Sequence, residues 1–208
     1  MKSKIIFTFV LILTLILTIS LTSCGDRDYD EAEVIEASRE LLLKSIEVNK
    51  VFYGEGLIID EDTNFSNGSY YPAYEPQLEN MSFSDIEGLK KLTESVYTKE
   101  LSELIFSTKL SSVEDESYVI SLARYYQRDD EFIRCIMVYK DAEVLYTNEV
   151  DYDYDSIKVI GADGEYIKIS VDTVLTDKEG SSEKVNIELI LLEEENGFRL
   201  DTLSFTQK

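Results

Sequence analysis

Carboxylates are the side chains most able to carry chemistry in this chain, because it has 42 Asp and Glu residues and no histidine. Without histidine there is no Ser-His-Asp triad, no Cys-His pair, no His-ligated zinc and no imidazole acid or base. A carboxylate pair of the glycosidase kind needs only Asp and Glu, so that mechanism stays open as an alternative. Accidental pairs are expected among so many acids, and the chain lacks tryptophan for sugar stacking. We therefore expect no enzyme activity, no catalytic residue and no cofactor.

One acidic segment begins like a calcium-binding loop. Asp151, Asp153 and Asp155 alternate as in the opening of an EF-hand loop. The sixth position is Ser156 where that loop needs glycine, and the twelfth is Ala162 where it needs a glutamate. We interpret the segment as an acidic strand edge and assign no metal site.

The two cysteines have different surroundings. Cys135 shares one face of an expected strand with Ile133 and Met137, which predicts a buried and unreactive thiol. Cys24 follows an apolar run over residues 5–21 that is preceded by Lys2 and Lys4. This order is typical of a secretory leader. The alternative is an uncleaved anchor helix, for which the run is only marginally long enough.

The end of that run, Leu-Thr-Ser-Cys at residues 21–24, resembles the lipobox of bacterial lipoproteins. The resemblance implies that residues 1–23 are a signal peptide and that Cys24 becomes the lipidated first residue of the mature protein. Two acyl chains, such as palmitate, hold a protein stably on a membrane that it does not span. We therefore expect a lipid-anchored protein on the extracytoplasmic face of the bacterial cell membrane, with residues 24–30 as a tether.

The formal net charge of −22 makes nucleic acid an unexpected partner, since the chain repels phosphate backbones. The hydrophobic content of 44% is too high for a disordered acidic tail. We expect residues 31–208 to form one domain.

Residues 57–83 show neither helical nor strand periodicity and contain both prolines of the chain. Long connections of this kind are often functional. Tyrosines and acids gather in or beside the segment, so it is the first candidate for a binding surface; the alternative is that the tyrosines pin the segment to the core. The candidate binding residues are Tyr53, Asp60, Asp62, Tyr70, Tyr71, Tyr74 and Glu75.

The spacing of apolar residues predicts helices first and strands afterwards. A helix is expected over residues 31–52, a second one from a capping box formed by Ser84 and Glu87, and a third over 99–106 with Leu101, Leu104 and Ile105 facing inward. Strands are expected over 118–127, 132–140, 156–160, 165–175, 185–191 and 198–205, with a less regular stretch over 143–152 and a tight turn at residues 196–197. This order predicts an α+β fold in which the N-terminal helices pack on a curved antiparallel sheet.

Two resemblances follow from these elements. The helix-then-meander order and the closing hairpin with Asn196-Gly197-Phe198-Arg199-Leu200-Asp201 look like the NTF2-like cone fold. The segments Phe52-Tyr53-Gly54-Glu55-Gly56, Tyr70-Tyr71, Ser84-Asp85-Ile86-Glu87-Gly88-Leu89 and Val96-Tyr97-Thr98 are similar to IseA-type inhibitors of cell-wall DL-endopeptidases and related clostridial lipoproteins.

The second resemblance implies a protein that is not an enzyme and that blocks a cell-wall hydrolase. We expect an extracytoplasmic module that binds a protein or a wall component. A small-ligand carrier with a pocket inside the cone is the alternative from a second class, and a carboxylate-pair hydrolase is the third.

Overall fold

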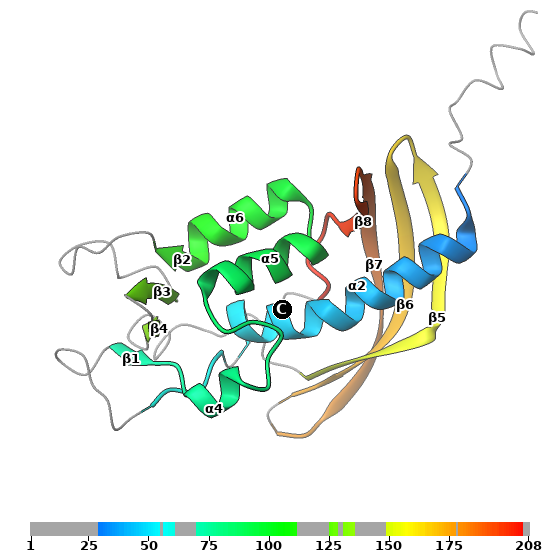
Figure 1. Ribbon diagram of the computed structural model, residues 1–208. Helices are drawn as coiled ribbons and strands as arrows, with labels where there is room; N and C mark the ends of the chain where they lie inside the picture. The colour runs from blue at the N-terminus through cyan, green and yellow to red at the C-terminus, as the bar shows by residue number, and fades with distance from the viewer. Residues whose placement is uncertain are drawn as a thin grey trace, which may run out of the picture.

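The computed structural model describes residues 29–54, 56–60, 70–111, 125–128, 131–135, 149–177 and 179–205, and of residues 70, 71, 111, 126–128 and 131–135 it describes the backbone alone. The elements appear in Figure 1 in this order: α2 (Glu31–Phe52), β1 (Tyr70–Pro72), α4 (Glu75–Leu78), α5 (Ile86–Val96), α6 (Lys99–Lys109), β2 (Leu110–Ser111), β3 (Tyr125–Arg128), β4 (Glu131–Cys135), β5 (Glu149–Asp163), β6 (Tyr166–Thr176), β7 (Ser182–Glu194) and β8 (Gly197–Leu200).

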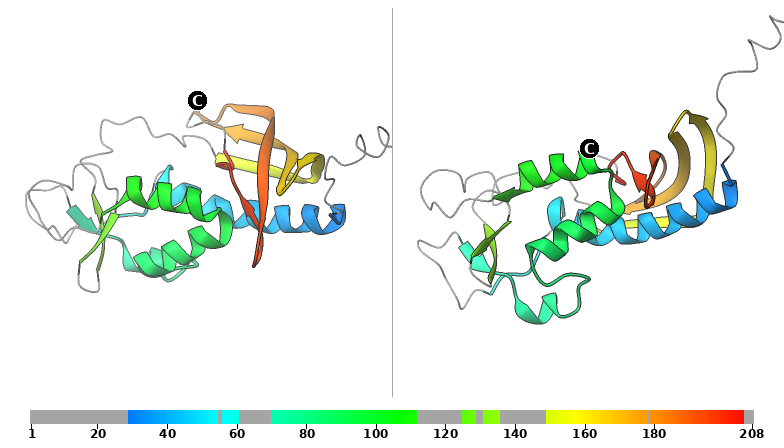
Figure 2. Two further views of the ribbon diagram at one scale, coloured as in Figure 1. Left: turned by 90° about the horizontal axis from the view of Figure 1, so that it is seen from above. Right: turned by 45° about the horizontal axis from the view of Figure 1, so that its top comes forward.

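The larger sheet is an antiparallel meander in the order β5-β6-β7-β8. It curves around α2, which runs along one of its faces (Figures 1 and 2). Along β6 the residues alternate, so that Ile167, Ile169, Val171 and Leu175 are buried on the face that forms the core. The predicted α+β fold, with N-terminal helices on a curved antiparallel sheet, is confirmed.

A smaller sheet has the order β1-β4-β3-β2 and lies at the far end of α2, beside α4, α5 and α6 (Figure 2). Its pairs are antiparallel except β2 with β3, which are parallel. Tyr125 links this sheet to the helix, because its buried hydroxyl accepts from the Leu57 N–H (2.9 Å) and donates to the Val51 carbonyl (3.1 Å). Helix α2 therefore connects the two ends of the molecule.

A hydrogen-bonded polar cluster lies inside the core, where α2, the α5–α6 junction, β5 and the C-terminal segment meet. The Asn49 amide donates to Ser204 Oγ (2.8 Å), Tyr97 OH donates to Asn49 Oδ1 (2.7 Å), and Ser204 Oγ donates to Ser45 Oγ (2.6 Å). Tyr152 OH donates to the Ser204 carbonyl. All five side chains are buried. Burial raises the pKa of both Tyr97 and Tyr152 above the usual value, since it disfavours the tyrosinate.

The first helix agrees with its prediction, and Asp30 caps it by accepting from the Ala32 and Glu33 N–H groups at 2.9 and 3.4 Å. The predicted capping box of the second helix is wrong. The cap is Asp85, whose carboxylate accepts from the Gly88 N–H (2.6 Å), while Glu87 pairs with Lys90 (2.8 Å).

The third helix continues to Lys109, three residues beyond the prediction, and Leu104 is exposed where an inward position was expected. Thr98 stands at its N-cap position, but its hydroxyl donates to Asp201 Oδ1 (2.8 Å) instead of capping the helix. Leu104 has polar neighbours at the helical spacing of three and four residues, Ser107 and Thr108, so it lies on the solvent side of the helix.

The strand predictions differ from the structure mainly in their ends. Residues 149–163 form one continuous strand, β5, with register shifts between Asp153 and Lys158 and between Val159 and Gly161, so the alternation that predicts a strand is broken there. The last strand ends at Leu200 instead of residue 205. The predicted strands 118–127 and 132–140 are β3 and β4 in the described part, and the remainder lies outside the described residues.

The predicted hairpin is present, but its two turn residues are 195–196, one residue before the prediction: Gly197, at a φ of 101°, begins β8 and pairs with Glu194. None of the helices among the described residues combines the length and the apolar character that crossing a membrane requires.

Candidate functional site: an apolar groove beside α4

A short antiparallel pairing holds two exposed apolar side chains side by side. Ile59 and Ala73 form an isolated β-bridge, flanked by bonds from the Tyr74 N–H to the Ile58 carbonyl (2.8 Å) and from the Asp60 N–H to the Pro72 carbonyl (2.9 Å). Ala73 points into the core. Ile58 and Tyr74 are 57% and 44% exposed, so this pairing displays them to solvent.

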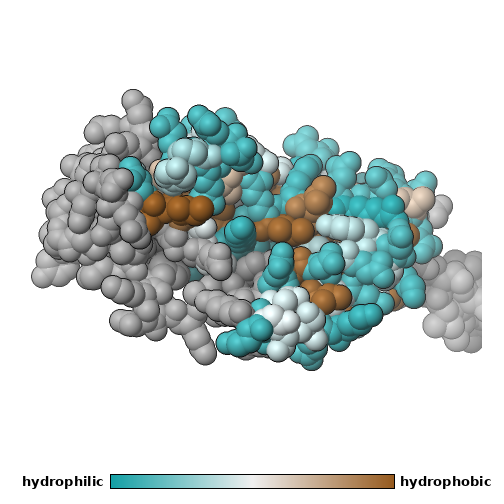
Figure 3. All heavy atoms as spheres, turned by 90° about the horizontal axis from the view of Figure 1, so that it is seen from below, coloured by the Kyte–Doolittle hydropathy of each residue, from teal (hydrophilic) through white to brown (hydrophobic). Residues whose placement is uncertain are grey.

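These two side chains line an open groove of about 520 Å³ between α2 and α4. The groove residues are Ile46, Glu47, Lys50, Val51, Gly56, Ile58, Tyr74, Pro76, Gln77, Asn80 and Met81. On the side of the molecule where α4 lies, hydrophobic side chains emerge in separate patches among hydrophilic ones (Figure 3). The groove surface is mainly apolar, which is the composition of a site that binds another molecule by contact area.

The polar side chains at the groove bind its own walls. Gln77 Oε1 accepts from the Ile58 N–H (2.6 Å), Glu47 Oε1 accepts from the Ser82 N–H (2.8 Å), and the Asn80 amide donates to the Pro76 carbonyl (2.8 Å). These bonds fix the segment that carries Tyr74 against α2. The apolar surface is thereby held in place before any partner arrives.

Three acidic residues lie within two residues of lining residues of the groove in the chain. Glu75 and Glu79 are exposed on either end of α4, and Asp60 is half-buried beside Ile58. Leu43 lies one helical turn before Ile46 and Glu47 on α2 and is 62% exposed, so it extends the apolar surface toward the start of the helix. The site therefore combines an apolar surface with acids beside it, while Glu47 and Lys50 are the charged residues that line the groove itself.

The structure divides the seven predicted binding residues into three groups. Tyr74, Asp60 and Glu75 lie at or beside the groove. Tyr53 belongs to the core instead: its ring packs against Phe205 at 5.1 Å between centroids, and Lys109 Nζ lies 5.0 Å from its centre. Tyr53 is therefore a core residue outside the groove.

Tyr70 and Tyr71 lie in β1, where their backbones pair with Cys135 and Arg134 of β4. Their side chains, and that of Cys135, lie outside what the structure describes, as do Asp62 and Cys24 altogether.

Sequence reasoning missed the aliphatic part of the groove. The signal was present in the triplets Leu41-Leu42-Leu43 and Leu57-Ile58-Ile59, because neither a helix nor a strand buries three consecutive side chains on one face. Leu43 and Ile58 are the members that remain outside.

The acidic segment that begins like a calcium loop lies in the extended strand β5, where Arg39 pairs with Asp155 at 3.1 Å. Within the described ranges no group of three or more Asp, Glu or Cys side chains is arranged to hold a metal ion.

No protein-family model matches this chain, and no curated protein matches it.

Proposed function

We propose that this protein is a lipid-anchored, extracytoplasmic binding protein without enzyme activity, and that it docks a protein partner at the groove between α2 and α4. The observation that carries the proposal is the pair of exposed side chains Ile58 and Tyr74 above an apolar groove of about 520 Å³. Its most specific form, which comes from the resemblance to IseA-type inhibitors, is inhibition of a cell-wall DL-endopeptidase.

The groove fits a polypeptide partner. An aromatic side chain at the centre of a preformed apolar surface is the usual source of binding energy in protein interfaces. The acids at Asp60, Glu75 and Glu79, on a chain of formal net charge −22, favour a partner with a basic cleft, because long-range attraction speeds the encounter of opposite charges.

The alternatives have less support in the described residues. A carrier would hold its ligand between α2 and the sheet, but Leu42, Ile169 and Leu189 fill that interface and are buried. A carboxylate-pair hydrolase would place two facing buried acids in a cleft. The described residues include no buried Asp or Glu that could form such a pair. Their buried polar side chains are hydroxyls and one amide, namely Ser38, Ser45, Asn49, Thr93, Thr98, Ser102, Ser170, Thr173 and Ser204.

The experiment follows the loss of turbidity of purified cell walls digested by a DL-endopeptidase, with and without the full-length protein in non-ionic detergent. Wild-type protein should slow digestion and bind the enzyme in a surface-based kinetic assay. If walls are digested at an undiminished rate under a large molar excess of the protein, the inhibitor form of the proposal is wrong.

Two aromatic variants locate the surface. Tyr74→Ala should speed dissociation by roughly 10-fold or more, the loss expected for a central aromatic anchor. Tyr166→Ala is the matched control, because Tyr166 is 49% exposed but lies on β6 away from the groove. Equal effects of the two substitutions would place the binding surface elsewhere.

Charge variants distinguish long-range electrostatic attraction during association from direct contacts in the complex. The triple substitution Asp60→Asn, Glu75→Gln and Glu79→Gln should slow association and reduce its salt dependence. The control is a triple substitution of exposed acids on the larger sheet that removes the same charge: Glu149→Gln, Asp163→Asn and Glu183→Gln. A slower association in the control alone would contradict the proposed docking face.

A further inference from the structure

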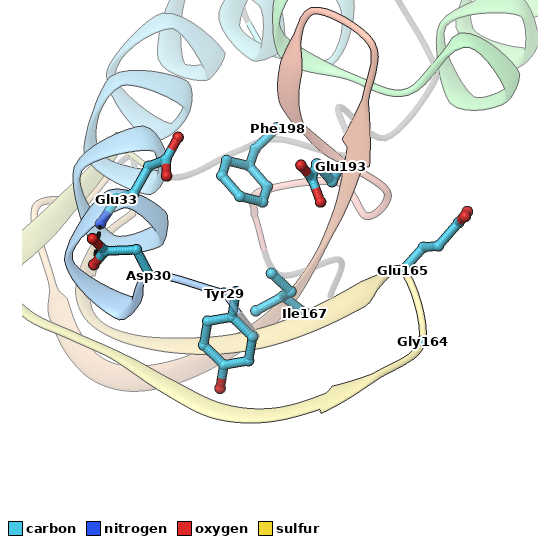
Figure 4. A pocket seen from close by; sticks show the side chains of 8 residues that line it. All are labelled: Tyr29, Asp30, Glu33, Gly164, Glu165, Ile167, Glu193 and Phe198. Atoms are coloured by element: carbon cyan, nitrogen blue, oxygen red, sulfur yellow. Dashed lines mark hydrogen bonds between the residues drawn. The ribbon is translucent and has the colours of Figure 1, made fainter. Parts of the chain in front are cut away.

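The start of α2 and the hairpin turns of the larger sheet lie together at one end of the molecule. Tyr29 from the start of the helix, Gly164 from the β5–β6 turn and Phe198 from the β7–β8 hairpin line a common cavity of about 210 Å³ (Figure 4). Tyr166 pairs with Asp163 across the β5–β6 turn, so its exposed side chain belongs to the same end. We call this part of the molecule the sheet end.

The groove lies far from the sheet end, because α2 runs between them (Figure 1). The helix has 22 residues, so its axis is about 33 Å long at about 1.5 Å per residue. Ile46 and Val51, which line the groove, lie about 22 and 30 Å along that axis from Glu31. The two sites are thus separated by most of the length of the helix.

The lipid anchor proposed at Cys24 limits the distance between the sheet end and a membrane. An extended chain spans at most about 3.6 Å per residue, so Tyr29 lies within about 18 Å of an acylated Cys24. Anchoring at this position therefore keeps the sheet end close to the bilayer. It leaves the tilt of α2 to the forces between the protein and the membrane surface.

Electrostatic repulsion favours one tilt. An anionic bilayer repels acids that come within about one Debye length of it, roughly 8 Å at physiological ionic strength. A molecule of formal net charge −22 that lies flat brings its whole long side into that layer, whereas a molecule that stands on the sheet end brings in only that end. The sheet end also has no attraction of its own for such a surface, since the charged side chains of residues 29–34 and 163–166 are all exposed acids: Asp30, Glu31, Glu33, Asp163 and Glu165.

We propose that the anchored protein stands on the membrane on its sheet end and presents the groove away from the bilayer. The orientation rests on the lipid anchor of the proposed function and specifies the kind of partner. The partner is a protein in the extracytoplasmic space or on the cell wall that approaches the groove from outside, not a protein embedded in the same bilayer.

The test places one fluorescent reporter at each end of the molecule. The chain has no tryptophan, so Tyr166→Trp and Tyr74→Trp each introduce a single one, at side chains that are 49% and 44% exposed. The lipidated full-length variants are added to vesicles of equimolar phosphatidylcholine and phosphatidylglycerol that contain dansyl-phosphatidylethanolamine. Energy transfer from tryptophan to dansyl should be several times greater from position 166 than from position 74.

Salt and lipid charge test the cause of the orientation. High salt shortens the Debye length to about 3 Å at 1 M, so it should increase the transfer from Tyr74→Trp. Vesicles of phosphatidylcholine alone should have the same effect. Ile160→Trp and Ile58→Trp, whose positions are 46% and 57% exposed at the sheet end and at the groove, form a second pair that should give the same difference.

Vesicle flotation distinguishes a failure of the orientation from a failure of the anchor. If the protein floats with the vesicles but transfer from position 74 equals or exceeds transfer from position 166, the orientation is wrong and the anchor stands. If the wild type does not float with the vesicles, the anchor is refuted and the orientation with it. A transfer from position 74 that responds to neither salt nor lipid charge would overturn repulsion as the cause.

Discussion

Ser204 joins three parts of the molecule through its hydroxyl and its carbonyl. It receives a hydrogen bond from Asn49 of α2 and one from Tyr152 of β5, and it lies 3.2 Å from the hydroxyl of Tyr97. Each polar group in this cluster is buried, so each needs its partner there. The cost of removing one member is mainly the cost of leaving the others without a hydrogen bond.

Tyr97→Phe tests this arrangement. The substitution keeps the ring but removes the donor to Asn49 Oδ1, so the free energy of unfolding should fall by about 1–3 kcal/mol in urea titrations. Tyr166→Phe, at an exposed position, should change it by less than about 0.5 kcal/mol. If Tyr97→Phe left the free energy of unfolding unchanged, the cluster would contribute little to stability.

The same cluster predicts a loss of stability in alkali. Burial raises the pKa of Tyr97 and Tyr152, whereas in the unfolded chain tyrosines ionise near pH 10. Above about pH 10 the unfolded chain therefore binds fewer protons than the folded one, and the free energy of unfolding falls by roughly 1.4 kcal/mol per pH unit for each buried tyrosine. Their contribution is fully present below that pH. Urea titrations between pH 9 and 11 should give a shallower decline for Tyr97→Phe than for wild type, and parallel declines would contradict the assignment.

At the scale of elements, α5 offers a sharp prediction about its cap. Asp85→Ala should lower the free energy of unfolding by about 1 kcal/mol, because it removes the acceptor for the Gly88 N–H. Ser84→Ala should lie within about 0.5 kcal/mol of wild type, since Ser84 is exposed and outside the cap. Urea unfolding of the two variants decides between the observed cap, Asp85, and the cap that the sequence favours, Ser84. A larger loss in the free energy of unfolding for Ser84→Ala would show that Ser84 is the cap.

The elements that could be predicted from the sequence are those with an uninterrupted period. Helix α2 and strands β6 and β7 each bury one regular face, and their predicted and observed ends agree within three residues. The sequence predicts only the second part of strand β5 as a regular strand, because the register shifts interrupt the alternation of buried and exposed residues. The first shift contains no glycine or proline that would mark it in the sequence. The cap of α5 was displaced by one residue because Ser84 and Asp85 are both good caps, and only the backbone geometry selects between them.

The candidate site was predicted in location but not in composition. The segment 57–83 does carry the groove, yet an emphasis on tyrosines and acids included Tyr53, which is buried, and omitted Ile58. The wall that α2 contributes could not be read from the segment itself, because Ile46 and Lys50 approach it only after the chain folds back. Sequence periodicity identifies the buried and exposed faces of a single helix or strand. It does not show which two elements will pack together to form a groove.

At the scale of the whole molecule, the lipid anchor predicted at Cys24 is the feature to test. Cys24→Ala should leave the precursor unprocessed and block fatty-acid attachment, because the thiol carries the acyl chains in the lipoproteins that residues 21–24 resemble. Labelled palmitate feeding and detergent partitioning of the wild type and the variant measure this. Cleavage and labelling that persist in Cys24→Ala would refute lipidation at this residue, while an uncleaved and unlabelled wild type would favour an anchor helix.

The long sequence separations of the hydrogen bonds to Ser204 also affect when the fold can close. The bonds from Ser204 to Ser45, Asn49, Tyr152 and Tyr97 span 159, 155, 52 and 107 residues. During synthesis or passage through a narrow channel, the Asn49 amide and the Tyr152 hydroxyl lack their Ser204 acceptors until residue 204 has emerged. Contacts between such distant residues form late and slowly. These elements, α2 and β5, should therefore stay open, and accessible to chaperones or proteases, until residue 204 has been released.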